Sequence, residues 1–191
     1  MSDSWDLLRP IFMRFIYESK HGLPIGRDGT VRVSYFIDLL SASHVDAHRK
    51  TMAEFFATWI GQAVSGTDIS AVVGPKRGNT LFAKAVADQL AKKSAFARDN
   101  ILFGRWIEGD VRPEDKVLLV DDVASEGEML LDAVESLREC GIWVDKAFVL
   151  VNRSEGDAKM YLERAGIDYS YAISLSDADL AGLLSEGRSQ A

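Results

Sequence analysis

Short apolar runs alternate with amphipathic helical segments over most of this chain, and this alternation constrains the fold more than any other feature. Strands that alternate with helices form a mostly parallel sheet with helices on both faces. The sequence therefore predicts an α/β, doubly wound domain. VLLV and FVLV are continuously apolar, as is typical of strands covered on both faces, so we expect them near the centre of the sheet. The strand-like runs are ISAVVG, KVLLVDD, KAFVLV and YSYAI.

The N-terminal region does not follow this alternation. Residues 4–20 have the apolar spacing of a helix that ends near Gly22, and the strand-like run VRVSYFIDL comes next. We predict that residues 1–40 form a small helix and hairpin hood. Residues 41–191 would form the core of the same single domain.

Composition narrows the classes of partner. The chain has 191 residues, of which 47% are hydrophobic, enough to bury one substantial core. Its 29 acidic residues outnumber 22 basic ones, which argues against binding to nucleic acid or an anionic membrane, since either needs a basic face. The start MSDSWDLLRP lacks the basic charge of a signal peptide, and the single cysteine, Cys140, fits a reducing compartment. We expect a cytoplasmic protein.

The loop DDVASEG carries the sharpest functional signal. Ligands of open α/β sheets bind beyond the carboxyl ends of the strands, and Asp121 and Asp122 lie at such an end. The turn from Ala124 to Gly127 then opens a helix, whose backbone amides favour an anion such as phosphate. Carboxylates there can accept hydrogen bonds from sugar hydroxyls or hold Mg²⁺. The pattern indicates a ribose phosphate, and paired acids that merely solvate a turn are the alternative.

Two further loops follow predicted strands. In GPKRGNT, Lys76 and Arg77 place two cations and exposed amides in one loop, which suits pyrophosphate unless the loop is simply a basic surface turn. Arg153 follows the strand that ends at Val151. Its guanidinium could hold the carboxylate of a planar base through a bidentate contact, or it could form a structural ion pair.

The segment KVLLVDDVASEGEMLLDAVESLRECG is similar to the phosphoribosyl pyrophosphate (PRPP) signature of type I phosphoribosyltransferases. DISAVVGPKRGNTLFAKAVA, VLVNRSEGDAKMYLERAGI and VSYFIDL resemble the pyrophosphate loop, a later strand and helix, and the N-terminal hairpin of the orotate branch of that family. The resemblance covers most of the chain, although only the ribose-phosphate loop is a specific motif. It implies a type I phosphoribosyltransferase-like fold, transfer from PRPP to a nitrogenous base, Mg²⁺ and a homodimer.

The same resemblance implies a role for each loop. Asp121 and Asp122 would hold the ribose hydroxyls or Mg²⁺, and the Ala124 to Gly127 amides would bind the 5'-phosphate. The GPKRGNT loop would bind pyrophosphate, helped by Arg105. The residues implied are Asp121, Asp122 and Arg105 for catalysis, and Lys76, Arg77, Gly78, Ala124, Ser125, Glu126, Gly127 and Arg153 for substrate binding.

Some residues depart from the family pattern. Glu126 and Glu128 stand where small or hydroxyl-bearing residues are usual, and a carboxylate about 5 Å from a phosphate dianion costs several kcal/mol. The stretch FARDNILFGRWIEGD offers only Arg98 and Arg105 as cations, where the family has a mobile loop rich in lysine. Two hypotheses follow. The chain is either a phosphoribosyltransferase or a catalytically degenerate binder of PRPP or nucleotides, acting as a regulator or assembly partner.

Overall fold

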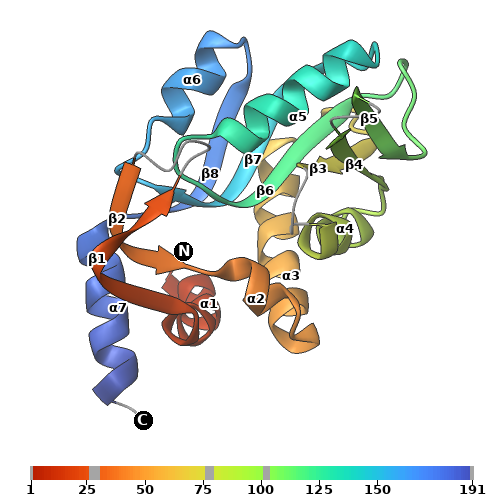
Figure 1. Ribbon diagram of the computed structural model, residues 1–191. Coiled ribbons are helices and arrows are strands. Elements are labelled where there is room, and N and C mark those ends of the chain that lie inside the picture. The colour runs from red at the N-terminus through yellow and green to blue at the C-terminus, as the bar shows by residue number, and fades with distance from the viewer. Residues whose placement is uncertain (1, 26–30, 76–79, 101–103, 190–191) are drawn as a thin grey trace.

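The computed structural model describes residues 2–25, 31–75, 80–100 and 104–189, and it contains a six-stranded sheet with helices on both faces (Figure 1). A separate two-stranded hairpin lies beside the sheet. In chain order the elements are α1 (Ser2–Arg14), β1 (Ile16–Ile25), β2 (Val31–Ile37), α2 (Leu39–Ser43), α3 (Asp46–Ala63), β3 (Ala71–Gly74), α4 (Thr80–Gln89), β4 (Lys93–Asn100), β5 (Gly104–Gly109), β6 (Val117–Ala124), α5 (Glu128–Glu139), β7 (Val144–Arg153), α6 (Ala158–Arg164), β8 (Asp168–Leu175) and α7 (Asp177–Ser189).

The strand order of the large sheet is β5-β4-β3-β6-β7-β8. All neighbouring pairs are parallel except β4 and β5, which are antiparallel. The predicted doubly wound, mostly parallel architecture is therefore confirmed. β6 and β7, which contain VLLV and FVLV, are interior strands as expected, and their pairing continues to Ala124 opposite Asn152. This pairing sets the ends of both strands at the same edge of the sheet.

Two hydrophobic cores flank the sheet, one on each face. Leu118 and Val120 of β6 pack in the core that α3 and α4 cover, while Leu119 packs in the core that α5 and α6 cover. All three side chains are fully buried, because consecutive residues of a strand point to opposite faces. Continuous apolar sequence in β6 is thus the direct consequence of having helices on both sides.

The hood consists of α1, the β1–β2 hairpin and, in addition, α7. Ion pairs join α7 to α1 through Arg9 and Glu186, and to β1 through Arg188 and Glu18, whose N–O distance is 3.2 Å. Figure 1 shows these elements clustered at one end of the molecule. The C-terminal helix, far from the hood in sequence, therefore packs against it.

The first helix is shorter than the spacing of residues 4–20 predicts. α1 ends at Arg14, and Ile16 begins a strand that pairs with Ile37 of β2. The amide of Phe15 donates to the Phe12 carbonyl over 2.9 Å, which tightens the last turn. Phe15 and Ile16 can pack in the core of the hood from an extended chain as well as from a helix. Pairing with β2 therefore determines that this segment forms a strand. The prediction of a helix to residue 20 was wrong for this reason.

The stretch FARDNILFGRWIEGD contributes to two strands rather than a loop. β4 and β5 form an antiparallel hairpin at the edge of the sheet, and Arg98 pairs across it with Glu108 at 2.6 Å. Gly109, with φ of 129°, lies so close to β4 that a Cβ atom would fall 2.7 Å from Ala95. Because few of its residues are large and apolar, the run KSAFARDN of β4 gave no strand signal.

Candidate functional site

Asp121 and Asp122 lie in the C-terminal half of β6, which continues two residues further than the sequence predicts, to Ala124. Asp121 is 4% exposed, and its Oδ1 accepts the amide hydrogen of Asp122 over 3.0 Å. The Asp122 carboxylate accepts from the Val123 amide over 2.8 Å, and a hydrogen bond joins the two carboxyl groups. Burial raises the pKa of Asp122 to about 6, against the hydrogen bonds from Val123 and Asp121, and the charge of Asp38 raises it further. Asp122 therefore takes up a proton as the pH falls through about 6.

The turn that follows places backbone hydrogen-bond donors at the start of α5. Gly127 occupies the N-cap position with φ of 73°, a left-handed conformation that glycine adopts without strain. Because glycine has no polar side chain, no side-chain hydrogen bond caps the first turn of α5 from this position. Among the described residues, no hydrogen-bond acceptor is found for the amides of Ser125, Glu126 or Gly127. Three unbonded amides at a helix N-terminus form a site for an anion, because the helix dipole adds to their partial positive charge.

The loop between β7 and α6 supports this turn from behind. The Ala158 amide donates to the Ser125 carbonyl over 3.0 Å. A Cβ atom on Gly156 would lie 2.1 Å from the same carbonyl oxygen, and one on Gly127 would lie 3.1 Å from Ala158. The carbonyl side of the turn is therefore bonded and tightly packed, which leaves its amides for a ligand.

Arg153 lies at the end of β7, where its guanidinium is only 5% exposed. Nε donates to the Leu175 carbonyl over 3.3 Å, and Nη1 donates to the Tyr35 carbonyl of the hood over 2.8 Å. Nη2 donates to Glu155 over 3.3 Å and also to Asp177. The structural ion pair that the sequence left open is thus present. A contact between Arg153 and a bound base stays a prediction.

Arg105 lies on β5 and pairs with the far end of α5. Its Nη1 and Nη2 atoms are each 2.6 Å from a carboxylate oxygen, of Glu139 and Glu135 respectively. Those residues follow Gly127 by eight and twelve positions, or about 12–18 Å along a helix. The structure therefore does not bring Arg105 to the turn, and its catalytic role stays a prediction.

Lys76, Arg77 and Gly78, which were predicted to bind pyrophosphate, lie outside the described residues. The strand that leads to them ends at Gly74, next to β6 in the sheet. Their loop therefore starts at the same edge as the aspartate pair, because β3 and β6 are parallel. Their contacts with a ligand remain a prediction.

The sequence analysis did not identify two carboxylates as candidate site residues. Asp38 follows β2, caps α2 by accepting from the Ser41 amide over 2.9 Å, and raises the pKa of Asp122 through its charge. Asp177 begins α7 and accepts hydrogen bonds from Arg153 and, over 3.3 Å, from the Ser34 amide. Asp38 directly follows a strand, and this position could have marked it as a candidate site residue. The partners of Asp177 are distant in sequence, so no local pattern marked that residue.

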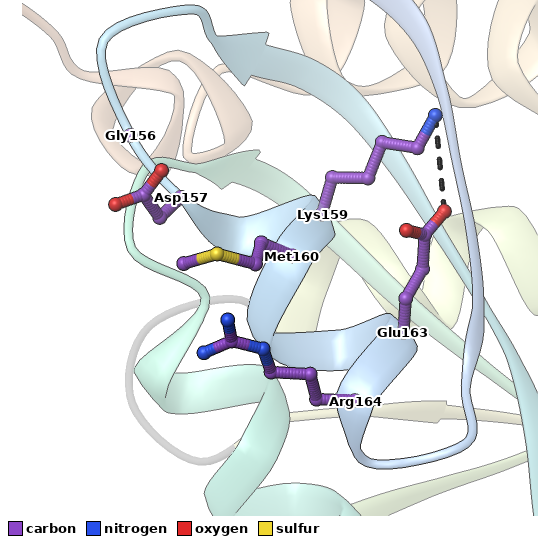
Figure 2. A pocket seen from close by; sticks show the side chains of 6 residues that line it. All are labelled: Gly156, Asp157, Lys159, Met160, Glu163 and Arg164. Carbon is purple, nitrogen blue, oxygen red and sulfur yellow. Dashed lines mark ion pairs between the residues drawn. The ribbon is translucent and has the colours of Figure 1, made fainter.

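A surface hollow of about 580 Å³ lies along α6 and is distinct from the strand-end site. Figure 2 shows Asp157, Met160 and Arg164 extending from one side of the helix, while Lys159 and Glu163 pair on another. Gly156, which also lines the hollow, is the residue packed behind the Ser125 turn. The hollow therefore adjoins the back of the turn rather than its amides.

Comparison with solved structures defines the class of fold. Orotate phosphoribosyltransferase from Aeropyrum pernix matches with a TM-score of 0.73 and 26% identity, over 94% of this chain and 98% of its own. The enzyme from Mycobacterium tuberculosis, solved in complex with PRPP, matches with a TM-score of 0.69 and 22% identity, over 94% and 99% of the two chains. The fold is that of the type I phosphoribosyltransferases, as the resemblance implied.

Sequence comparison is more specific. Orotate phosphoribosyltransferase from Methanothermobacter thermautotrophicus is 31% identical over 168 residues, which span 86% of this chain and 87% of the relative. The protein of that name from Methanocaldococcus jannaschii is 33% identical over 71% of this chain and 75% of its own length. No family model matches the chain. At this identity and coverage, the chain belongs to the orotate phosphoribosyltransferase family.

Proposed function

We propose that this protein transfers a phosphoribosyl group from PRPP to a nitrogenous base and releases pyrophosphate. The observation that carries the proposal is the row of amides from Ser125 to Gly127, which have no acceptor within the described part of the chain and follow the Asp121–Asp122 pair by two residues. Such a row suits the 5'-phosphate of the donor, and the carboxyl pair suits the vicinal hydroxyls of its ribose. Family membership supports the same reading, since the relatives are named orotate phosphoribosyltransferases.

The reaction breaks the bond between ribose C1 and the pyrophosphate oxygen and forms a bond between C1 and a base nitrogen. C1 becomes cation-like as pyrophosphate leaves, so the site must fix the sugar and neutralise the leaving group. Asp121 and Asp122 would fix the sugar. Lys76 and Arg77, whose loop continues from β3, would neutralise the leaving group. Arg153 would lie beside the base, at the junction of strand end and hood.

The aspartate pair also fits Mg²⁺. No group of three or more His, Cys, Asp or Glu side chains within the described ranges is arranged to hold a metal. Mg²⁺ does not need such a cage, because one or two carboxylates together with substrate phosphates usually suffice. Mg²⁺ bound with the donor would supply positive charge for the departing pyrophosphate. Asp121 and Asp122 would hold it in competition with the proton that Asp122 takes up as the pH falls through about 6.

Location and assembly belong to the same proposal. Among the described helices, none has the length and apolar character that crossing a membrane requires. We infer a cytoplasmic homodimer, which the single cysteine and the family resemblance support.

Calorimetric titration with PRPP and Mg²⁺, followed by a pyrophosphate-release assay with a panel of bases, tests the proposal. Binding and turnover are expected. Binding without turnover on any base would instead favour the non-catalytic binder, and no binding at millimolar donor would remove both. Asp122→Asn is expected to weaken donor binding, whereas Asp145→Asn, which changes an exposed acid at the opposite end of β7, is the matched control.

A further inference from the structure

The outward side of α6, a helix at the outside of the molecule (Figure 1), carries a short row of side chains that we name the α6 stripe. Its members are Asp157, Met160, Tyr161 and Arg164. Spacings of three, four and seven positions place all of them on one face of the helix. Lys159 and Glu163, which pair at 3.8 Å, occupy another side of α6 (Figure 2). The stripe borders the hollow of about 580 Å³ described above.

The two ends of the stripe carry opposite charges, and neither charge has a partner within the described ranges of the chain. Asp157 is the N-cap residue of α6, but its side chain accepts no capping hydrogen bond. Arg164, the last residue of the helix, forms no ion pair or hydrogen bond with the described residues. Both side chains are exposed. An acid and a base about 10 Å apart along the helix are therefore available to a second molecule.

The middle of the stripe is apolar. Tyr161 is 40% exposed, and Met160 is half-buried beside it. Aromatic residues, methionine and arginine are enriched at protein–protein interfaces, and the stripe contains one of each. A thioether also makes favourable contacts with an aromatic ring. The composition of the stripe thus fits a protein surface as its partner.

The order of the stripe is complementary to its own reverse. When two α6 helices lie antiparallel about a two-fold axis, the axis passes between Met160 and Tyr161. Asp157 of each copy then faces Arg164 of the other, so that opposite charges meet at both ends. Met160 of each copy faces Tyr161 of the other at the centre. A contact of this kind is isologous, because both copies use the same residues.

We propose that the α6 stripe binds a second copy of this chain through antiparallel pairing of two α6 helices. A two-fold contact requires a surface that matches its own reverse, whereas a different protein would not. The helix spans only about 10 Å, so the contact is small and association through it is weak and concentration-dependent. Where the inferred homodimer forms through another face, pairing of α6 joins two dimers. The contact would lie behind the Ser125 turn, because Ala158 of α6 donates to the Ser125 carbonyl.

Analytical ultracentrifugation of the full chain over a range of concentrations tests the contact with two charge-reversal variants. In Asp157→Arg both ends of the stripe are basic, and in Arg164→Asp both are acidic. Each variant alone is expected to associate through this contact about tenfold or more weakly than the native protein, because two attractions become repulsions. An equimolar mixture of the two variants places opposite charges at both ends again. Its association should return to within about threefold of the native level.

Lys159→Glu and Glu163→Lys are the matched controls. They change the net charge by the same amounts as the two test variants, but on another side of α6 (Figure 2). Alone or mixed, they should associate as the native protein does. The double variant that carries both Asp157→Arg and Arg164→Asp keeps the complementarity with its own reverse, so it should also associate like the native protein.

Two results would overturn the proposal. Native protein that associates no more strongly than either test variant would leave the stripe to a different partner. A mixture that associates no more strongly than its components would show that positions 157 and 164 of two copies do not face each other. Both results are read from subunit mass, so they are independent of PRPP binding and of turnover.

Discussion

The two ends of α5 differ in whether their polar groups have partners within the chain. At the N-terminal end, the amides from Ser125 to Gly127 have no acceptor among the described residues. At the C-terminal end, Arg105 of β5 bridges Glu135 and Glu139 and anchors the edge hairpin to the helix. One end is thus satisfied within the chain and the other is left for a ligand. The comparison teaches that unmet hydrogen-bonding capacity, rather than charge alone, distinguishes a site from a structural contact.

The largest effect is expected where the turn is packed from behind. Gly156→Val places a Cβ atom 2.1 Å from the Ser125 carbonyl oxygen, so the turn must move, at a cost of about 3 kcal/mol or more. Urea denaturation measures this loss. Gly182→Ala in α7 is the control, because it meets no atom within 4 Å and should stabilise the helix by about 0.5–1 kcal/mol. A native-like free energy of unfolding for Gly156→Val would contradict the packing account.

Asp122→Asn tests the site at the N-terminal end of α5 through the pH dependence of stability. The folded-state pKa of Asp122, about 6, lies above its ordinary value of 3.8, so the ionised side chain destabilises the fold increasingly as pH rises through this interval. The asparagine variant should be more stable than the native protein by about 3 kcal/mol at pH 7.5, and no different below about pH 4. Thermal unfolding across this range measures the difference. A variant less stable at pH 7.5 would show that the carboxylate stabilises the fold.

Glu126→Thr tests the acidic substitution within the turn. Removing a carboxylate from among the amides should raise the affinity for PRPP about tenfold, since a negative charge near the 5'-phosphate is lost. Calorimetric titration provides the measurement. Glu163→Thr on α6, which changes an exposed acid whose partner is Lys159, should leave the affinity unchanged. Unchanged affinity for both variants would mean that Glu126 does not face the ligand.

The smallest effect is expected at the C-terminal end of α5, where Arg105 pairs with Glu135 and Glu139. Arg105→Met should lower the free energy of unfolding by about 0.5–1 kcal/mol, because exposed ion pairs contribute little. From the described pairs we expect its kcat to stay within twofold of the native value. Urea denaturation and the pyrophosphate assay measure the two quantities. A tenfold or larger fall in kcat would instead support the sequence-based assignment of Arg105 to the pyrophosphate.

The sequence was most informative where strand, turn and helix are contiguous. VLLV, the two aspartates and Gly127 predicted an interior strand, a carboxyl pair and a helix start, because each depends on local spacing. The sequence was least informative where strand pairing determines the secondary structure. β1 and β4 carry mixed polar and apolar residues, and they become strands only because β2 and β3 offer partners.

Arg153 shows the same limit at the level of a side chain. Its position at the end of β7 could be predicted from the sequence, but its partners Tyr35 and Asp177 come from segments 118 residues earlier and 24 residues later. Whether a guanidinium binds a ligand or its own chain depends on such distant contacts. No local pattern could have decided between the two alternatives.

Backbone NMR of the labelled protein, titrated with PRPP and Mg²⁺, tests the central claim most directly. The claim predicts that the amide resonances of Ser125, Glu126 and Gly127 shift markedly and become protected from exchange, while those near Arg105 change little. Saturable binding that leaves the three amides unperturbed would contradict it, because the donor phosphate would then lie elsewhere.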